Sequence, residues 1–220
     1  MSLSGTGIVP TYALSPSAIT FPNQAVSVAS QTQVLTLTNT GPLALPITNI
    51  TDNGTNANQF TESHNCGAAV PAGASCAINV TFLPTSTGTK VASLNVVGGA
   101  SAGTQSVPLS GTGVVPTFSV APTALAFGSQ PRSTSSAART VTISNTAAVQ
   151  LPITSITLNG ANPGQYSQTN TCVSPLAMGG SCTISVIFRP TSAGAKAANL
   201  NVTAGGGGGT QSVALTGTGT

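Results

Sequence analysis

Charged residues are scarce in this sequence. They make up 3% of its 220 residues, against roughly a quarter in a typical soluble protein. The five basic residues are scattered over both halves of the chain, and only Arg132 and Arg139 lie close together. Because nucleic-acid binding needs a dense basic patch, we expect isolated solubilising charges and no nucleic-acid partner.

Tryptophan is absent, aromatic residues are few and long apolar runs are missing. The chain is nevertheless 40% hydrophobic, which excludes the composition of a disordered protein. The helix formers Glu, Lys and Arg are almost missing, whereas Thr, Ser and Asn are common and 25 Gly and 15 Pro can make turns. This mixture predicts an all-β protein. No run approaches the roughly 18 apolar residues of a membrane span, so we do not expect a membrane-embedded chain.

A secretion signal is also missing at the N-terminus, where Met1 is followed at once by polar residues and by Gly-Thr-Gly at residues 5–7. The same motif recurs at residues 111–113 and 217–219, a period of 106 residues. Such a period indicates two complete copies of one domain, which we place at residues 8–113 and 114–219. Because both ends carry the motif that closes a repeat, we expect a piece of a longer array, with neighbouring repeats as partners.

Histidine occurs once, at His64, and cysteine four times. Cys66 and Cys76 recur one period later as Cys172 and Cys182, with nine residues between the members of each pair. Zinc is the alternative, but it takes four ligands, and His64 has no counterpart in the second repeat. The spacing therefore favours one disulfide in each repeat and an oxidising compartment. Closing so short a loop would stabilise a domain by up to ~3 kcal/mol.

Apolar and polar residues alternate over short segments that end at turn residues. Cys76, Ile78, Val80 and Phe82 face one way and polar residues the other, and residues 182–188 repeat this phase. Each repeat holds about seven or eight such strands, as is typical of an immunoglobulin-like β-sandwich. The absence of Trp and the short cysteine spacing exclude the core of antibody domains. Since only Gly-Val-Val-Pro joins the repeats, we expect a semi-rigid, elongated pair.

Residues that could carry catalysis are few. Asp52 and Glu62 are the only carboxylate side chains, and their counterparts are Leu158 and Gln168. Both lie in or beside a polar loop, where solvated charges are expected, and no serine-histidine-acid set accompanies His64. We therefore predict a protein that is not an enzyme, with no catalytic, cofactor-binding or metal-binding residues and no cofactor.

Two further features invite a functional interpretation. Lys90 and Lys196 are the one charge common to both repeats, and we expect them on the surface or on edge strands, where they would discourage aggregation. The glycine run 205–209 lacks the Lys-Ser/Thr ending of a phosphate-binding loop. It occupies the place of residues 98–102 and predicts a hairpin tip.

Four motifs occur at matching places in both repeats. In the first they are Asn39-Thr40 after a strand, Gly-x-Ser-Cys at 73–76, Phe-x-Pro-Thr at 82–85 and the closing Gly-Thr-Gly. With these motifs, nearly the whole chain resembles the ASH/Hydin-like immunoglobulin family, and in particular its bacterial choice-of-anchor D repeats. The resemblance implies a seven-stranded sandwich of the major sperm protein and pilus-chaperone group, with no common catalytic residues.

The resemblance also implies a role and a location. Bacterial members are secreted or surface-attached, whereas the eukaryotic relatives are intracellular, a setting that paired cysteines and low charge argue against. We expect a structural spacer in an exported, extracellular or cell-surface bacterial protein. The alternative is an adhesion module that binds a protein or a glycan through an edge strand or through sandwich-end loops such as residues 52–58 and 158–164.

Overall fold

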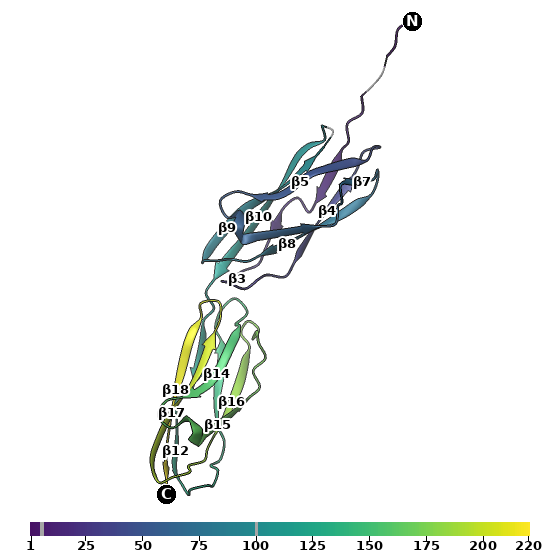
Figure 1. The fold of residues 1–220 in the computed structure, drawn as a ribbon. Coiled ribbons are helices and arrows are strands. Elements are labelled where there is room, and N and C mark those ends of the chain that lie inside the picture. Colours follow the sequence, from purple (N-terminus) through teal and green to yellow (C-terminus); the bar gives the residue numbers. More distant parts are fainter. Residues whose placement is uncertain (5–6, 100) are drawn as a thin grey trace. The chain divides into compact units, whose positions relative to one another are not determined.

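A computed structural model describes residues 1–4, 7–99 and 101–220. Gly5 and Thr6 of the first Gly-Thr-Gly motif, and Ala100 in the first predicted hairpin tip, lie outside the described residues. The chain divides into two compact units, Met1–Gly113 (unit 1) and Val114–Thr220 (unit 2). Each unit is a sandwich of two β-sheets (Figure 1), so the prediction of an all-β, immunoglobulin-like fold is confirmed.

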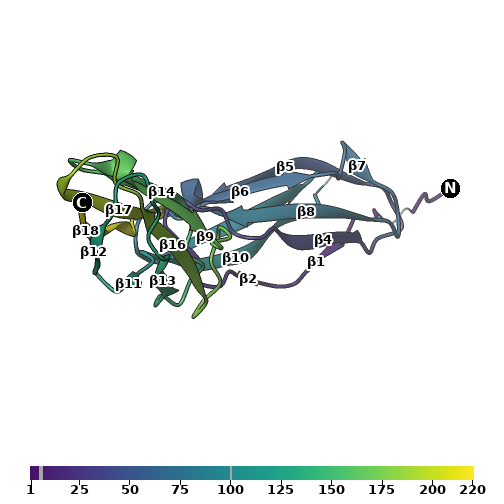
Figure 2. The same cartoon turned by 90° about the horizontal axis from the view of Figure 1, so that it is seen from below.

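Unit 1 is built from short strands and one 3-10 helix. Its described elements are β1 (Tyr12–Ser15), β2 (Ile19–Thr20), β3 (Gln24–Ala25), β4 (Gln33–Asn39), β5 (Leu45–Asn53), η1 (Ala57–Gln59), β6 (Phe60–His64), β7 (Ala69–Val70), β8 (Ser75–Phe82), β9 (Gly88–Gly98) and β10 (Gly103–Val114). One sheet has the order β1-β4-β8-β6, and the other has the order β2-β10-β9-β5-β7, with β3 also paired to β10. Figure 2 shows these two layers from a second direction.

Unit 2 repeats this plan in a more regular form. Its described elements are β11 (Phe118–Ala121), β12 (Ala124–Gln130), β13 (Arg139–Asn145), β14 (Ile153–Asn159), η2 (Pro163–Gln165), β15 (Tyr166–Asn170), β16 (Ser181–Phe188), β17 (Gly194–Ala204) and β18 (Gly209–Gly219). The sheets have the orders β11-β13-β16-β15 and β12-β18-β17-β14.

The first strand of each unit is divided between the two sheets. In unit 1, β1 pairs antiparallel with β4, and after Pro16 the chain crosses over so that β2 pairs parallel with β10. Proline has no amide hydrogen and cannot continue the ladder, so the crossing falls at this residue. Pro122 separates β11 from β12 in the same way. With this division, unit 2 has eight strands among its described residues, in keeping with the seven or eight expected.

Each unit has its own hydrophobic core between the sheets. In β8, all four side chains of the predicted inward row, Cys76, Ile78, Val80 and Phe82, are buried. The matching row in β16 is buried too, with the ring of Phe188 fully enclosed. Strict alternation over eight residues therefore placed the core correctly, because successive side chains of a strand point to opposite faces.

Both predicted disulfides are present. Cys66 is bonded to Cys76 with a Cα–Cα distance of 4.9 Å, and Cys172 is bonded to Cys182 with 5.0 Å. In unit 1 the bridge joins the segment after β6 to its neighbour β8, so it lies within one sheet. Both of its cysteines are buried against the core.

The Gly-Thr-Gly motif lies where the last strand passes over the Phe-x-Pro-Thr turn. A Cβ atom on Gly111 would lie 2.6 Å from the ring of Phe82, and one on Gly217 would lie 2.5 Å from the ring of Phe188. A Cβ atom on Gly113 would meet the backbone of the turn itself. Since interiors are close-packed, a larger residue here must displace a core ring. The closing Gly-Thr-Gly motif and the Phe-x-Pro-Thr motif therefore pack against each other.

The shared Asn-Thr motif holds a buried asparagine. Asn39 donates from Nδ2 to the carbonyl oxygens of Leu43, at 2.7 Å, and Val70, at 2.9 Å, and its Oδ1 accepts from the amide of Gly41 at 3.0 Å. Asn145 makes the corresponding bonds in unit 2. These bonds fasten the end of a central strand to two loops, and a buried amide needs such partners.

The glycine run in unit 2 forms a hairpin tip, as predicted. It connects β17 to β18, with Ala204 opposite Gly209. Gly206, Gly207 and Gly209 have positive φ, a backbone conformation that glycine adopts without steric cost. In unit 1 the corresponding hairpin joins β9 to β10.

Candidate functional site

The two carboxyl groups meet at one side of unit 1. Asp52 lies on β5 and Glu62 on β6, strands of opposite sheets that run along the same side of the sandwich (Figure 2). Both occupy inward positions, since Asp52 is opposite the buried Leu94 and Glu62 is opposite the buried Val80. The two side chains therefore face the gap between the sheets.

The surroundings of Asp52 favour its neutral form. Burial raises its pKa from 3.8 to about 6, and the charge of Glu62 adds to the rise. Its Oδ1 atom is buried and has no hydrogen-bond partner among the described residues. The expectation of a solvated charge in a loop is wrong for Asp52, because β5 continues through this position and half-buries the side chain. The pair belongs to unit 1 alone, since Leu158 and Gln168 replace it in unit 2.

The other groups that sequence reasoning considered do not join this pair into a catalytic set. His64 is exposed at the end of β6. Among the residues that the structure describes, no three or more His, Cys, Asp or Glu side chains are grouped so that they could hold a metal ion. None of the helices within the described ranges could span a bilayer.

The two shared lysines are not on edge strands. Lys90 lies on β9, between β10 and β5, and is only 7% exposed. Its Nζ donates to the hydroxyl of Ser86 and the carbonyl of Thr87, both at 2.9 Å. Lys196, on the interior strand β17, donates to the carbonyl of Ala193 at 2.9 Å. The expectation of an edge charge is therefore wrong, and the physical reason is that the carbonyl groups of the preceding turn need a donor.

The sandwich-end loops before β6 and β15 use their amide side chains internally. The Oδ1 atom of Asn56 accepts from the amide of Val91 at 3.0 Å, and that of Asn162 accepts from the amide of Ala197 at 3.1 Å. The backbone amide of Asn56 donates to the carbonyl of Val91, and that of Asn162 donates to the carbonyl of Ala197. Each asparagine thus pairs with both backbone groups of one residue in the neighbouring strand, β9 in unit 1 and β17 in unit 2.

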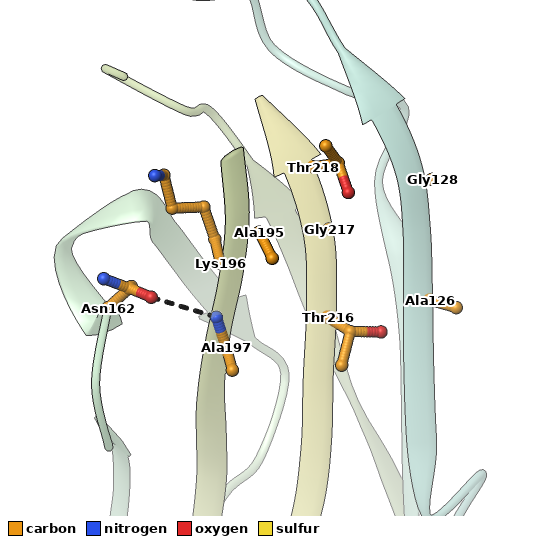
Figure 3. A pocket seen from close by; sticks show the side chains of 9 residues that line it. All are labelled: Ala126, Gly128, Asn162, Ala195, Lys196, Ala197, Thr216, Gly217 and Thr218. Atoms are coloured by element: carbon orange, nitrogen blue, oxygen red, sulfur yellow. Dashed lines mark hydrogen bonds between the residues drawn. The ribbon is translucent and has the colours of Figure 1, made fainter. Parts of the chain in front are cut away.

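An open hollow of about 370 Å³ lies on the outer face of the second sheet of unit 2. Figure 3 shows short side chains along three neighbouring strands and the hydrogen bond that closes one side. The lining comes from β12, β17, β18 and the loop before η2: Ala126, Gly128, Asn162, Ala195, Lys196, Ala197, Thr216, Gly217 and Thr218. The polar side-chain groups on this face are two hydroxyls and an amide, whereas the side chain of Lys196 lies on the inner side of the sheet, opposite Gly217.

Unit 2 also holds four of the five basic side chains and no carboxylate side chain. Unit 1 holds one basic side chain and both carboxylates. Basic residues thus occur in both repeats, as expected, but they are concentrated in unit 2. The cations of unit 2 are Arg132, Arg139, Arg189 and Lys196, of which the three arginines are exposed.

Two loops place the arginines at one end of unit 2. Residues 131–138 connect β12 to β13, and residues 189–193 connect β16 to β17. The loops are bonded to each other, since Arg189 Nε donates to the carbonyl of Ser133 at 3.2 Å and the amide of Ser133 donates to the carbonyl of Pro190 at 2.7 Å. Arg132 is the residue before Ser133, so it lies beside the Arg189 loop.

The remaining two cations flank these loops. Arg139 begins β13 opposite Val186, close to the end of β16, and its guanidinium carbon lies 5.6 Å from the centre of the Phe127 ring. Lys196 is bonded to Ala193 within the second loop. Pairing of strands distant in the sequence thus gathers all four cations of the unit. The feature of the sequence that could have indicated this basic end is the difference in charge between the two repeats.

The comparisons with known proteins address the fold. No protein-family model matches the sequence, and no curated protein matches it. Cadherin-like domains 1 to 4 of zebrafish RET are similar in structure, with 10% identity, a TM-score of 0.52 and coverage of 96% of this chain and 52% of that one.

Two further solved structures are similar at lower TM-scores. The ASH/PapD-like domain 7 of human CEP192 has 18% identity, a TM-score of 0.37 and coverage of 52% of this chain and 97% of that one. The CupB2 chaperone of Pseudomonas aeruginosa has 10% identity, a TM-score of 0.33 and coverage of 92% and 98%.

Proposed function

We propose that the chain is a non-catalytic spacer module of a secreted or cell-surface bacterial repeat protein, built from two ASH-type domains like those of choice-of-anchor D proteins. The observation that carries this proposal is the use of the polar residues common to both repeats. Asn39, Asn56 and Lys90 each bond the backbone of their own unit, and each has a counterpart with the same role. The polar residues that both repeats share therefore stabilise the fold of each unit.

The glycines of the Gly-Thr-Gly motif and the disulfides support the same proposal. Gly111 and its counterpart allow close contact with a core ring, and each disulfide closes a short loop beside the core. A module that transmits force or sets a distance needs folded units that stay folded. The carboxyl pair, which would be needed for acid-base chemistry, is not part of the shared set.

Single-molecule pulling on the two-unit chain tests the spacer role. We expect two separate unfolding events, each releasing a chain length of about 3.5 Å per residue. With the disulfides intact, each event is shorter by the ten-position separation of the bridged cysteines, and reductant restores that length. Extension without resolved unfolding events would contradict a load-bearing spacer.

Thiol alkylation followed by mass measurement tests the exported location. We expect no alkylation of protein taken from its native source without reductant, and four modified cysteines after reduction. Four free thiols in the native protein would contradict export, because disulfides persist in oxidising compartments.

The alternative role, an adhesion module for a protein or glycan, has a specific observation in its favour only in unit 2. There an end that is rich in cations adjoins the open hollow.

A further inference from the structure

We propose that unit 2 binds an anionic polysaccharide at the end formed by loops 131–138 and 189–193. This binding role goes beyond the spacer role and does not rest on it. The glycan class is defined by its chemistry: a chain of sugars that carry carboxylate or sulfate groups. The three arginines supply the charge, and the hollow beside the two loops supplies space for a sugar ring.

The arginines are not needed for the fold. The equivalent positions of unit 1 hold Val26 for Arg132, Gln33 for Arg139 and Leu83 for Arg189, and unit 1 forms the same sandwich. No carboxylate side chain in unit 2 neutralises them. Guanidinium groups bind carboxylate and sulfate-like oxygens with paired hydrogen bonds. An anionic partner is therefore the complement of this end.

The hollow adjoins the basic end because two of its lining residues lie next to the loops: Gly128 precedes loop 131–138 by three residues, and Ala195 follows loop 189–193 by two. Lys196 itself faces the inner side of the sheet, opposite Gly217, and its ammonium group is bonded to Ala193 in the second loop. Along the hollow, Thr216 and Thr218 present side chains from β18 (Figure 3). Hydroxyl and amide groups suit the neutral hydroxyls of a sugar, and about 370 Å³ lies within the size range of small-molecule sites.

At two positions the hollow is lined by smaller residues than those of unit 1. Ala197 and Gly128 stand where unit 1 has Val91 and Pro22, and the larger side chains occupy the corresponding space. Val91 is 52% exposed, so it covers the surface of its sheet. The smaller lining residues and the additional arginines therefore occur in the same repeat.

The observations favour a polysaccharide over nucleic acid or lipid. All four aromatic side chains of unit 2 are buried, so none is offered for stacking on bases. The exposed Val173 and Met178 lie in the loop between β15 and β16, at the opposite end of β16 from Arg189. The basic end thus lacks apolar side chains for insertion into a bilayer. The disulfides also indicate an oxidising compartment, and not the cytosol or nucleus, where nucleic acids are concentrated.

Calorimetric binding on the whole two-unit chain tests the proposal, with polygalacturonate and heparin as probes and dextran as the neutral control. We expect both anionic chains, and not dextran, to bind at low salt. Replacing the arginines by their unit 1 counterparts, Arg132→Val, Arg139→Gln and Arg189→Leu, should weaken binding at least ~10-fold and reduce the salt slope by roughly 3. Equal affinity of this variant, or absence of binding by the unmodified chain, would overturn the proposal.

A second variant separates a glycan from other polyanions. Ala197→Val copies unit 1 and fills the hollow, so it should weaken polygalacturonate binding several-fold without changing the salt slope. A DNA duplex serves as the competing probe, and we expect its affinity to be unaffected by this variant. Tighter binding of DNA than of polygalacturonate, together with no effect of Ala197→Val on either, would overturn the glycan assignment in favour of nucleic acid. Circular dichroism and melting verify that each variant folds.

Discussion

Units 1 and 2 share a fold but differ in charge. Both hold a disulfide within one sheet, a buried asparagine after a central strand and a glycine against a core phenylalanine. Unit 1 alone has a carboxyl pair facing the gap between its sheets, and unit 2 alone gathers four cations at one end. The same scaffold therefore tolerates opposite electrostatics, because charges at its ends and sides are not part of its core.

The largest expected effect comes from the glycine under the core ring. Gly111→Val should destabilise unit 1 by about 3 kcal/mol or more, because the added atoms overlap the Phe82 ring and the core cannot give way. Gly217→Val should do the same to unit 2 and spare unit 1. Urea titration followed by NMR signals assigned to each unit distinguishes the two. Similar stability of the variant and the unmodified unit would mean that the strand can move away from the ring.

Reduction of the disulfides should have the next largest effect. Each unit should lose up to ~3 kcal/mol on the chain-entropy model, since both bridges close loops of the same length. The pairs Cys66→Ser with Cys76→Ser, and Cys172→Ser with Cys182→Ser, remove one bridge at a time. A loss confined to one unit in the reduced chain would show that the two bridges are not equivalent.

The buried asparagine should rank third. Asn39→Ala removes three hydrogen bonds and takes this donor from the carbonyl groups of Leu43 and Val70, which should cost unit 1 about 2 kcal/mol. Asn145→Ala is the matched change in unit 2. The melting temperature of each unit gives the measurement. If Asn39→Ala melts like the unmodified chain, water has replaced the amide and the bonds are not needed.

The smallest effect should be a pH dependence that only unit 1 shows. The folded-state pKa of Asp52, about 6, lies above its ordinary value of 3.8. The folded unit therefore holds the proton more tightly, so the stabilisation is complete below about pH 4 and is lost as the pH rises through 6. Since the side chain is half-exposed and screened, we expect a loss of about 1 kcal/mol.

The control for this pH dependence is Asp52→Asn, which should remove it, while Leu158 gives unit 2 no such dependence. Urea titrations at pH 4, 5.5 and 7, read separately for each unit, provide the measurement. A parallel change in both units would assign the effect to a general property of the chain.

Much of the fold could be predicted from the sequence because its signals are local. Alternation over residues 76–82 identified a strand and its buried face, and the glycine run 205–209 identified a hairpin tip. The repeat then acted as an internal control, since a residue present in both copies was assigned to the fold. Asn39 passes this test and is fully buried. The division of the first strand between two sheets escaped prediction, because it depends on pairing with the last strand.

The candidate site could be predicted only in part. Lys90 was expected on a surface, yet it is buried, because its ammonium group donates to the hydroxyl of Ser86 and the carbonyl of Thr87 in the preceding turn. Asp52 was expected in a loop, yet β5 extends through it and places it opposite Leu94. The exposure of a polar side chain depends on the neighbouring strands and turns that pack against it. The alternation of residues within one strand does not specify those neighbours.

The sequence by itself determined that the protein has two copies of an all-β unit, which apolar residues of the alternating strands are buried and which cysteines can pair. These are properties of short segments and of the 106-residue period. The tertiary structure alone decided that Asp52 and Glu62 share one gap, and that Arg132, Arg139 and Arg189 share one end with Lys196. Strand pairing between distant segments brings these side chains together. The interactions between their charges become appreciable only at such short separations.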